Sequence, residues 1–103
     1  MVKLVALYRK PPDVAAFERE YFLTHVPLIN QVPGLRHLEV TRVTGAPRGE
    51  PDFYMMAEMY FPDRETMDRA MSSPENIQAG KNLFSFARGL VTMFFVEDAL
   101  DHA

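Results

Sequence analysis

The chain has 103 residues, 48% of them hydrophobic and 12% aromatic, which is enough for one domain with a small core. Its formal net charge of -3, without a block of like charges, argues against a nucleic-acid partner or an anionic membrane surface. No apolar run approaches the roughly 18 residues of a membrane span and no cleavable signal is visible, so we expect a single cytoplasmic domain over residues 1–103.

Metal, disulfide and cofactor chemistry find little support in the residue types present. The chain contains no cysteine, which excludes disulfides, thiolate ligands and cysteine catalysis. Its three histidines, His25, His37 and His102, are too few for a histidine-rich metal site. Neither a glycine-rich phosphate loop nor a nucleophile elbow is present. We therefore expect no metal and no cofactor.

The first strand is predicted over Val2–Arg9, where alternation leaves both faces apolar in the middle. A half-solvated strand would carry polar residues on its outer face, so this strand should be covered on both sides. Pro11 and Pro12 end it.

A helix is predicted over Asp13–Val32, with Asp13 positioned to cap its first turn. Pro27 lacks the amide proton that would reach the carbonyl of Leu23 and biases Val26 away from helical dihedrals, so we expect a kink next to His25. The buried stripe at spacings of three and four consists of Val14, Phe17, Tyr21, His25, Leu28 and Val32.

Two further strands are predicted on either side of a long loop. Pro33 and Gly34 mark a turn, Leu35–Val43 follows as a strand, and Thr44–Pro51 reads as the loop. In the strand Phe53–Phe61 one face is expected to join the core: Phe53, Met55, Ala57, Met59 and Phe61. The other face is aromatic and polarizable, which fits equally a ligand-pocket wall and a subunit interface: Tyr54, Met56, Glu58 and Tyr60.

The last third of the chain is predicted to contain a short helix, a second helix and a strand. Asp63 caps the short helix, and Ser73 with Pro74 starts the second one, which Gly89 ends. The inner side of the short helix is expected to hold Met67, Ala70 and Met71, and the buried stripe of the second to hold Ile77, Phe84 and Ala87. Leu90–Glu97 is again apolar on both faces, and residues 98–103 form a polar tail.

This order of elements predicts an α+β, ferredoxin-like βαββαβ fold with a four-stranded antiparallel sheet. Its helix–sheet core should contain Phe17, Leu28, Met55, Ala57, Met59 and Phe61. The two predicted helices can cover only one face of such a sheet, yet the first and last strands look apolar on both. We therefore expect a two-fold homodimer in which two sheets close face to face into an α+β barrel.

The segment FEREYFLTHVPL, with Phe17, Tyr21, His25, Pro27 and Leu28, resembles the first-helix signature of the EthD family of the dimeric α+β barrel superfamily. The likeness in length and element order extends over nearly the whole chain and implies the same homodimer. The family is linked to bacterial degradation of an ether fuel additive, and enzymes of the wider superfamily act on aromatic or ketonic metabolites without a cofactor. One departure is Ser85, between Phe84 and Phe86, where an acidic residue is usual in the family.

His25 is the candidate general acid or base, because its unperturbed pKa of about 6.5 lies near working pH. Alternatively it is a packed residue whose nitrogens bond nearby carbonyls. Glu58 is its candidate catalytic partner, or else the partner of an arginine on a neighbouring strand such as Arg36 or Arg42. The substrate-binding residues we expect around an apolar pocket between helices and sheet are Tyr21, Tyr54, Tyr60, Phe84 and Phe86.

Three functions fit these residues. The first is a cofactor-independent oxidoreductase or lyase acting on a small, largely apolar organic metabolite in the catabolism of ether or aromatic compounds. The second is a non-catalytic binding or carrier protein for such a molecule. The third is a structural dimer module.

Overall fold

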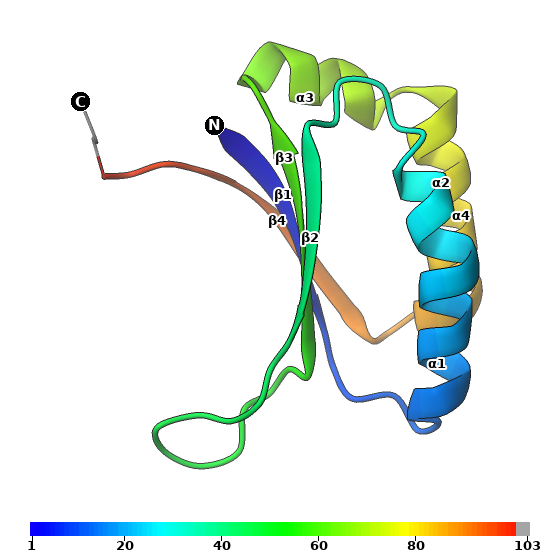
Figure 1. Ribbon diagram of the computed structural model, residues 1–103, viewed down its shortest axis with the longest axis vertical. Helices are drawn as coiled ribbons and strands as arrows, with labels where there is room; N and C mark the ends of the chain where they lie inside the picture. The colour runs from blue at the N-terminus through cyan, green and yellow to red at the C-terminus, as the bar shows by residue number, and fades with distance from the viewer. Residues whose placement is uncertain (101–103) are drawn as a thin grey trace.

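The computed structural model describes residues 1–100; the last three residues of the predicted tail, 101–103, lie outside the described part. Four antiparallel strands form one sheet in the order β2-β3-β1-β4 (Figure 1). Their bounds are β1 (Val2–Tyr8), β2 (His37–Arg42), β3 (Met55–Phe61) and β4 (Val91–Glu97). The predicted ferredoxin-like α+β fold is confirmed.

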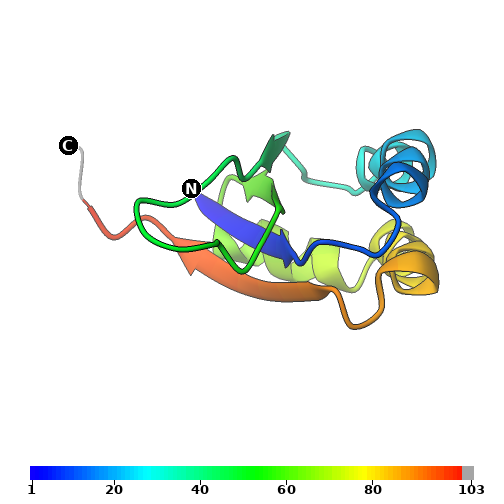
Figure 2. The same cartoon turned by 90° about the horizontal axis from the view of Figure 1, so that it is seen from below.

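The helices cover one face of this sheet, as the view in Figure 2 makes plain. They are α1 (Val14–Glu20), α2 (Val26–Ile29), α3 (Arg64–Met71) and α4 (Pro74–Ala87). The first helical segment and α4 lie side by side, and α3 sits at one end of the sheet (Figure 1). None of the helices within residues 1–100 combines the length and apolar character needed to cross a bilayer.

Short polar side chains start the helices where predicted. Asp13 accepts a hydrogen bond from the Ala16 N–H at 3.0 Å, and Asp63 accepts one from the Thr66 N–H at 2.8 Å. Ser73 accepts one from the Asn76 N–H at 3.2 Å. Each bond satisfies a backbone donor that the first turn of a helix leaves without a partner.

The helix widens by one residue per turn just before Pro27. Between α1 and α2 the chain forms a π-helical turn, η1 (Tyr21–His25), and the Val26 N–H bonds the carbonyl of Tyr21, five residues back. Val26 keeps helical dihedrals of φ -58° and ψ -45°, so the prediction that it would leave the helical region is wrong. A turn widened just before Pro27 accommodates a residue that has no N–H and a bulky ring, and the helix continues.

The core lies between the helices and the sheet. Phe17 and four of the five residues predicted for the inner face of the third strand are buried: Met55, Ala57, Met59 and Phe61. Phe53, the fifth, precedes β3 and is only partly buried, as is Leu28. The cross-strand register explains why this face of the sheet is buried. Leu4 lies opposite Met59 and Ala6 opposite Ala57, so these four side chains share the helix-covered face. The predicted helix–sheet core is thus confirmed, except that Leu28 is only partly buried.

The buried stripe of α4 differs from the prediction. Ala79, Leu83 and Ala87 face the core, four residues apart, whereas Ile77 and Phe84 are 50% and 44% exposed. Only Ala87 of the predicted stripe is therefore buried. Small residues permit α4 to approach the first helix closely, and the two large side chains are displaced toward its flank.

The sheet face opposite the helices carries alternate residues of each strand. Lys3, Val5 and Leu7 of β1 lie beside Met56 and the other outward residues of β3. Beyond the ends of β2, the Arg36 N–H bonds the Tyr60 carbonyl at 2.8 Å, and the Val43 N–H bonds the Tyr54 carbonyl at 2.7 Å. These two bonds extend the pairing over most of the predicted strand Leu35–Val43.

A candidate ligand cavity around His25

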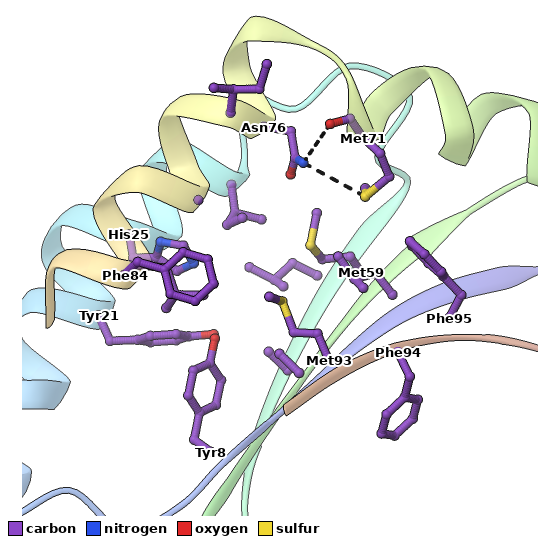
Figure 3. A pocket seen from close by; sticks show the side chains of 18 residues that line it. Tyr8, Tyr21, His25, Met59, Met71, Asn76, Phe84, Met93, Phe94 and Phe95 are labelled. Atoms are coloured by element: carbon purple, nitrogen blue, oxygen red, sulfur yellow. Dashed lines mark hydrogen bonds between the residues drawn. The ribbon is translucent and has the colours of Figure 1, made fainter. Parts of the chain in front are cut away.

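A cavity of about 360 Å³ lies between the helices and the sheet (Figure 3). Its floor is the inner face of the sheet, its walls come from η1, α2 and α4, and its rim carries exposed apolar side chains of α4 and β4. A volume of this size fits a small organic ligand. Its polar lining side chains are Tyr8, Tyr21, His25 and Asn76, and the apolar ones include Leu4, Ile29, Met59, Leu83, Met93 and Phe95.

Small residues on neighbouring strands and on a helix create this space. Ala6 of β1 lies directly opposite Ala57 of β3, so two adjacent positions of the floor hold only a methyl group each. On the wall, Gly80 sits in the middle of α4, and a Cβ added there would meet no atom within 4 Å. The small side chains at these three positions therefore leave the space that forms part of the cavity.

His25 lies in η1 and is only 3% exposed. Its Nδ1 is 3.1 Å from Oδ1 of Asn82 in α4, and the Asn82 Nδ2 donates to Oε1 of Glu20 at 3.2 Å. Because the Glu20 carboxylate can only accept, the Asn82 amide nitrogen faces it and the amide oxygen faces His25. Nδ1 must then carry the proton that is donated to Asn82, and in the neutral ring the lone pair lies on Nε2.

Burial lowers the pKa of His25 below its ordinary value, because the charged ring would lose its hydration. The hydrogen bond with Asn82 opposes this effect without overcoming it. The imidazole is therefore neutral at neutral pH, which suits it to accept a proton rather than to hold an anion by charge.

An aromatic cluster fixes the other side of the His25 ring. The Tyr21 ring lies 5.3 Å from the His25 ring and 5.3 Å from the Tyr8 ring, measured between centroids. The Tyr8 and Tyr21 rings meet edge to face, with an interplanar angle of 77°. Burial raises the pKa of Tyr21 to about 12 and that of Tyr8 well above its usual range, so both stay uncharged in the cavity wall.

Of the five predicted substrate-binding residues, Tyr21 and Phe84 line the cavity. Phe86 packs in the core instead, with its ring 5.3 Å from that of Phe17 and 6.2 Å from that of His25. Tyr54 precedes β3, and its ring lies 5.9 Å from that of Phe17; its buried hydroxyl has no partner among residues 1–100.

Tyr60 and Glu58 lie on the sheet face opposite the cavity, because strand alternation sends them away from their neighbours Ala57 and Met59. Lys3 lies between them: its Nζ is 2.8 Å from Oε2 of Glu58 and 5.0 Å from the centre of the Tyr60 ring. The prediction that Glu58 pairs with His25 is therefore wrong, because the two side chains lie on opposite sides of the sheet.

The alternative prediction, that Glu58 pairs with an arginine, is also wrong, because its partner is a lysine. Arg42 of β2 bonds Oε1 of Glu18 at 2.7 Å, and Glu58 has Lys3 on the adjacent strand as its ion-pair partner. This ion pair raises the pKa of Lys3 through its hydrogen bond to the carboxylate. The charge pair therefore contributes to the sheet surface and not to the cavity.

Sequence reasoning missed Asn82, Asn76 and Gly80. Asparagine and glycine are poor residues inside a helix, so their presence within Pro74–Ala87 is a signal that side chains there serve contacts other than helix formation. Nothing in the local pattern indicates that Asn82 meets His25, because 57 residues separate them.

Metal binding finds no support in the described part of the chain. Residues 1–100 contain no group of three or more His, Asp or Glu side chains close enough to hold an ion. His102, one of the three histidines considered above, lies outside that range.

Comparison with known proteins gives the family. The chain matches the family described as EthD domain over residues 9–89. It is 32% identical over 98 residues, 95% of each chain, to an uncharacterised 11.0 kDa protein from the thcB-thcC intergenic region of Rhodococcus erythropolis. The crystal structure of an ethyl tert-butyl ether D (EthD) family protein from Bacillus halodurans matches with a TM-score of 0.90 and 47% identity, covering 95% of this chain and 98% of that one.

Two more distant structures share the fold. A dimeric ferredoxin-like protein of unknown function from Jannaschia sp. CCS1 matches with a TM-score of 0.72 and 13% identity, over 94% of this chain and 98% of that one. SnoaB, a cofactor-independent oxygenase from Streptomyces nogalater, matches with a TM-score of 0.69 and 16% identity, over 98% and 95%. The two close matches and the family match each span most of the chain, and the chain therefore belongs to the EthD family.

Proposed function

We propose that this protein binds a small, uncharged, largely apolar organic molecule in the cavity around His25 and exchanges a proton with it. The observation that carries the proposal is the coincidence of a 360 Å³ cavity with one buried, oriented imidazole in an otherwise apolar wall. Pockets that are mostly apolar with a few placed polar groups are the usual form of small-molecule sites.

The lining residues support an uncharged ligand. No lysine or arginine of residues 1–100 lines the cavity, and its histidine is kept neutral by burial. A carboxylate or phosphate placed there would lose its hydration without gaining a countercharge, which is strongly unfavourable. Acyl-coenzyme and nucleotide ligands are therefore disfavoured by the same argument.

Proton transfer is the step that His25 can perform. With Nδ1–H donated to Asn82, Nε2 can take a proton from an acidic C–H or O–H of the ligand, and Asn82 stabilises the imidazolium that forms. The electron pair left on the ligand then either expels a leaving group, as in a lyase, or passes to an oxidant such as dioxygen. The description of the similar fold SnoaB as a cofactor-independent oxygenase supports the second route.

A non-catalytic carrier is the second candidate. It is favoured by the absence of a carboxylate beside His25, because Glu58 lies on the opposite face of the sheet and Glu20 reaches the ring only through Asn82. A carrier would need the cavity and its rim but no proton transfer.

The homodimer remains part of the proposal. The sheet face away from the helices carries Val5, Leu7 and Phe94; Val5 is buried, whereas Phe94 of the edge strand β4 is 42% exposed. An exposed apolar face of this kind is stabilised by a second copy packed against it. The description of the similar Jannaschia structure as dimeric supports the same assembly.

Binding and turnover can be tested separately with simple probes. Naphthalene, β-naphthol and the ketone β-tetralone should raise the melting temperature, whereas the anion β-naphthoate should not. Deuterium uptake at the α-carbon of β-tetralone, followed by NMR in deuterium oxide, should be fast with the wild type and close to the buffer rate with His25→Asn. If His25→Asn binds and exchanges like the wild type, proton transfer by His25 is refuted and the carrier stands; if no neutral probe binds, both fail.

A further inference from the structure

The cavity has a polar group at the end away from the tyrosine pair. Asn76, the third residue of α4, lines the cavity, and Figure 3 shows it at the opposite end from Tyr8 and Tyr21. The space between these ends is lined by apolar side chains such as Met59 and Leu83. A ligand long enough to fill the cavity would therefore meet one polar group at each end.

The orientation of the Asn76 amide follows from its contacts. Its Nδ2 donates to the Met71 carbonyl at 3.2 Å and lies 3.8 Å from the Met71 sulfur. A carbonyl oxygen can only accept, so the amide nitrogen must be on the Met71 side. Oδ1 consequently points away from Met71 and toward the cavity, as Figure 3 shows.

This oxygen is an available acceptor. Within residues 1–100, the hydrogen bonds of Asn76 are made by its backbone N–H, to Ser73, and by its Nδ2. Asn76 is only part-buried, so in the free protein Oδ1 can bond water. When a ligand displaces that water, Oδ1 either receives a hydrogen bond from the ligand or loses the one it had. A lost bond that is not replaced is costly, and sites of this kind disfavour ligands that lack the matching donor.

We propose that Asn76 is a specificity residue that accepts a hydrogen bond from a hydroxyl or N–H group of the ligand. The ligand class is then an uncharged molecule with an apolar body and a donor group at one end, distant from the group that meets His25. This inference rests on the proposed function of the cavity and adds to it the requirement that the ligand carry a hydrogen-bond donor at the end near Asn76.

Three probes of graded polarity test it: naphthalene, β-naphthol, and a naphthalene diol with hydroxyls at opposite ends. Dissociation constants are measured by NMR titration for the wild type, Asn76→Leu and Asn76→Asp. In the wild type the diol should bind about two- to tenfold more tightly than β-naphthol, the range of one net hydrogen bond. Asn76→Leu should abolish that gain, so that it binds the diol no more tightly than β-naphthol.

The aspartate variant separates recognition from structure. Both variants lose the amide donor to the Met71 carbonyl, so both should melt below the wild type, but Asn76→Asp keeps oxygens that can accept from the diol. Retention of the diol preference in Asn76→Asp and its loss in Asn76→Leu would establish the acceptor role. An equal diol preference in all three proteins would overturn the inference and leave the cavity function intact. Failure of every probe to bind the wild type would instead refute the cavity function itself.

Discussion

Replacing Gly80 tests directly whether the cavity is genuine open space. The residue lies in the middle of α4 and lines the cavity, and a Cβ there would meet no atom within 4 Å. Glycine inside a helix is less favourable than alanine by about 0.5–1 kcal/mol. Gly80→Ala should therefore stabilise the fold by that amount, which for a domain near 100 residues raises the melting temperature by about 2–8 °C.

Gly89 provides the matched control for this substitution. A Cβ at Gly89 also meets nothing within 4 Å, but its φ of +80° lies in the left-handed region that side chains disfavour. Gly89→Ala should therefore destabilise by about 1–2 kcal/mol although its surroundings are equally empty. In both variants the added Cβ has open space, so the opposite signs expected for them come from the backbone conformation, and calorimetry of both measures that effect.

A larger side chain at the same position tests the link to binding. Gly80→Leu directs a branched side chain into the cavity, so the stabilisation of the wild type by naphthalene should disappear while the variant stays folded. Thermal shift with and without the probe measures both quantities. A fall in melting temperature for Gly80→Ala, or naphthalene binding by Gly80→Leu as strong as in the wild type, would refute the description of this wall as open cavity.

Three other predictions follow from the buried groups and the exposed sheet face. Phe17→Ala should lower the free energy of unfolding by about 3–5 kcal/mol, because Phe17 is 5% exposed; a chemical denaturation midpoint equal to that of the wild type contradicts this. His25 has a lowered pKa in the folded state, so stability should fall as pH drops below its unfolded value, and His25→Asn should flatten the denaturation profile in that window; parallel profiles for the two proteins refute the assignment. Sedimentation equilibrium at tens of micromolar should give twice the 11.8 kDa mass of the chain, and a persistent monomer excludes the homodimer.

Local chemistry explains why the fold was predictable from the sequence. Asp13, Asp63 and Ser73 start their helices through bonds to residues three positions on, so the cap signal and its partner lie together in the chain. Alternation in β3 likewise decides which residues face the helices, because the period of a strand is fixed by backbone geometry. These rules need no knowledge of distant residues.

The site was only half predictable, for two different physical reasons. The Asn82 partner of His25 comes from a helix 57 residues away, and only tertiary packing brings the two together. Glu58 is another matter, because the alternation that assigns Ala57 and Met59 to the helix-covered face necessarily sends Glu58 to the other one. Strict use of the strand period therefore excludes the His25–Glu58 pair from the sequence alone.

The same residues that form the cavity also limit the stability of the unliganded protein. Ala6 and Ala57 leave the sheet floor unfilled, Gly80 weakens α4, and burial of His25 disfavours its charged form. At each of these positions a larger apolar residue would give the folded state more packing contacts or a more favourable helix propensity. A ligand that fills the cavity restores contacts to these walls and is bound by the folded state alone, so it stabilises the fold in proportion to the logarithm of its concentration above its dissociation constant. Melting temperature is for this reason the natural first assay for the ligand, and a cavity-filled variant such as Gly80→Leu should already possess part of the stability that the wild type gains only on binding.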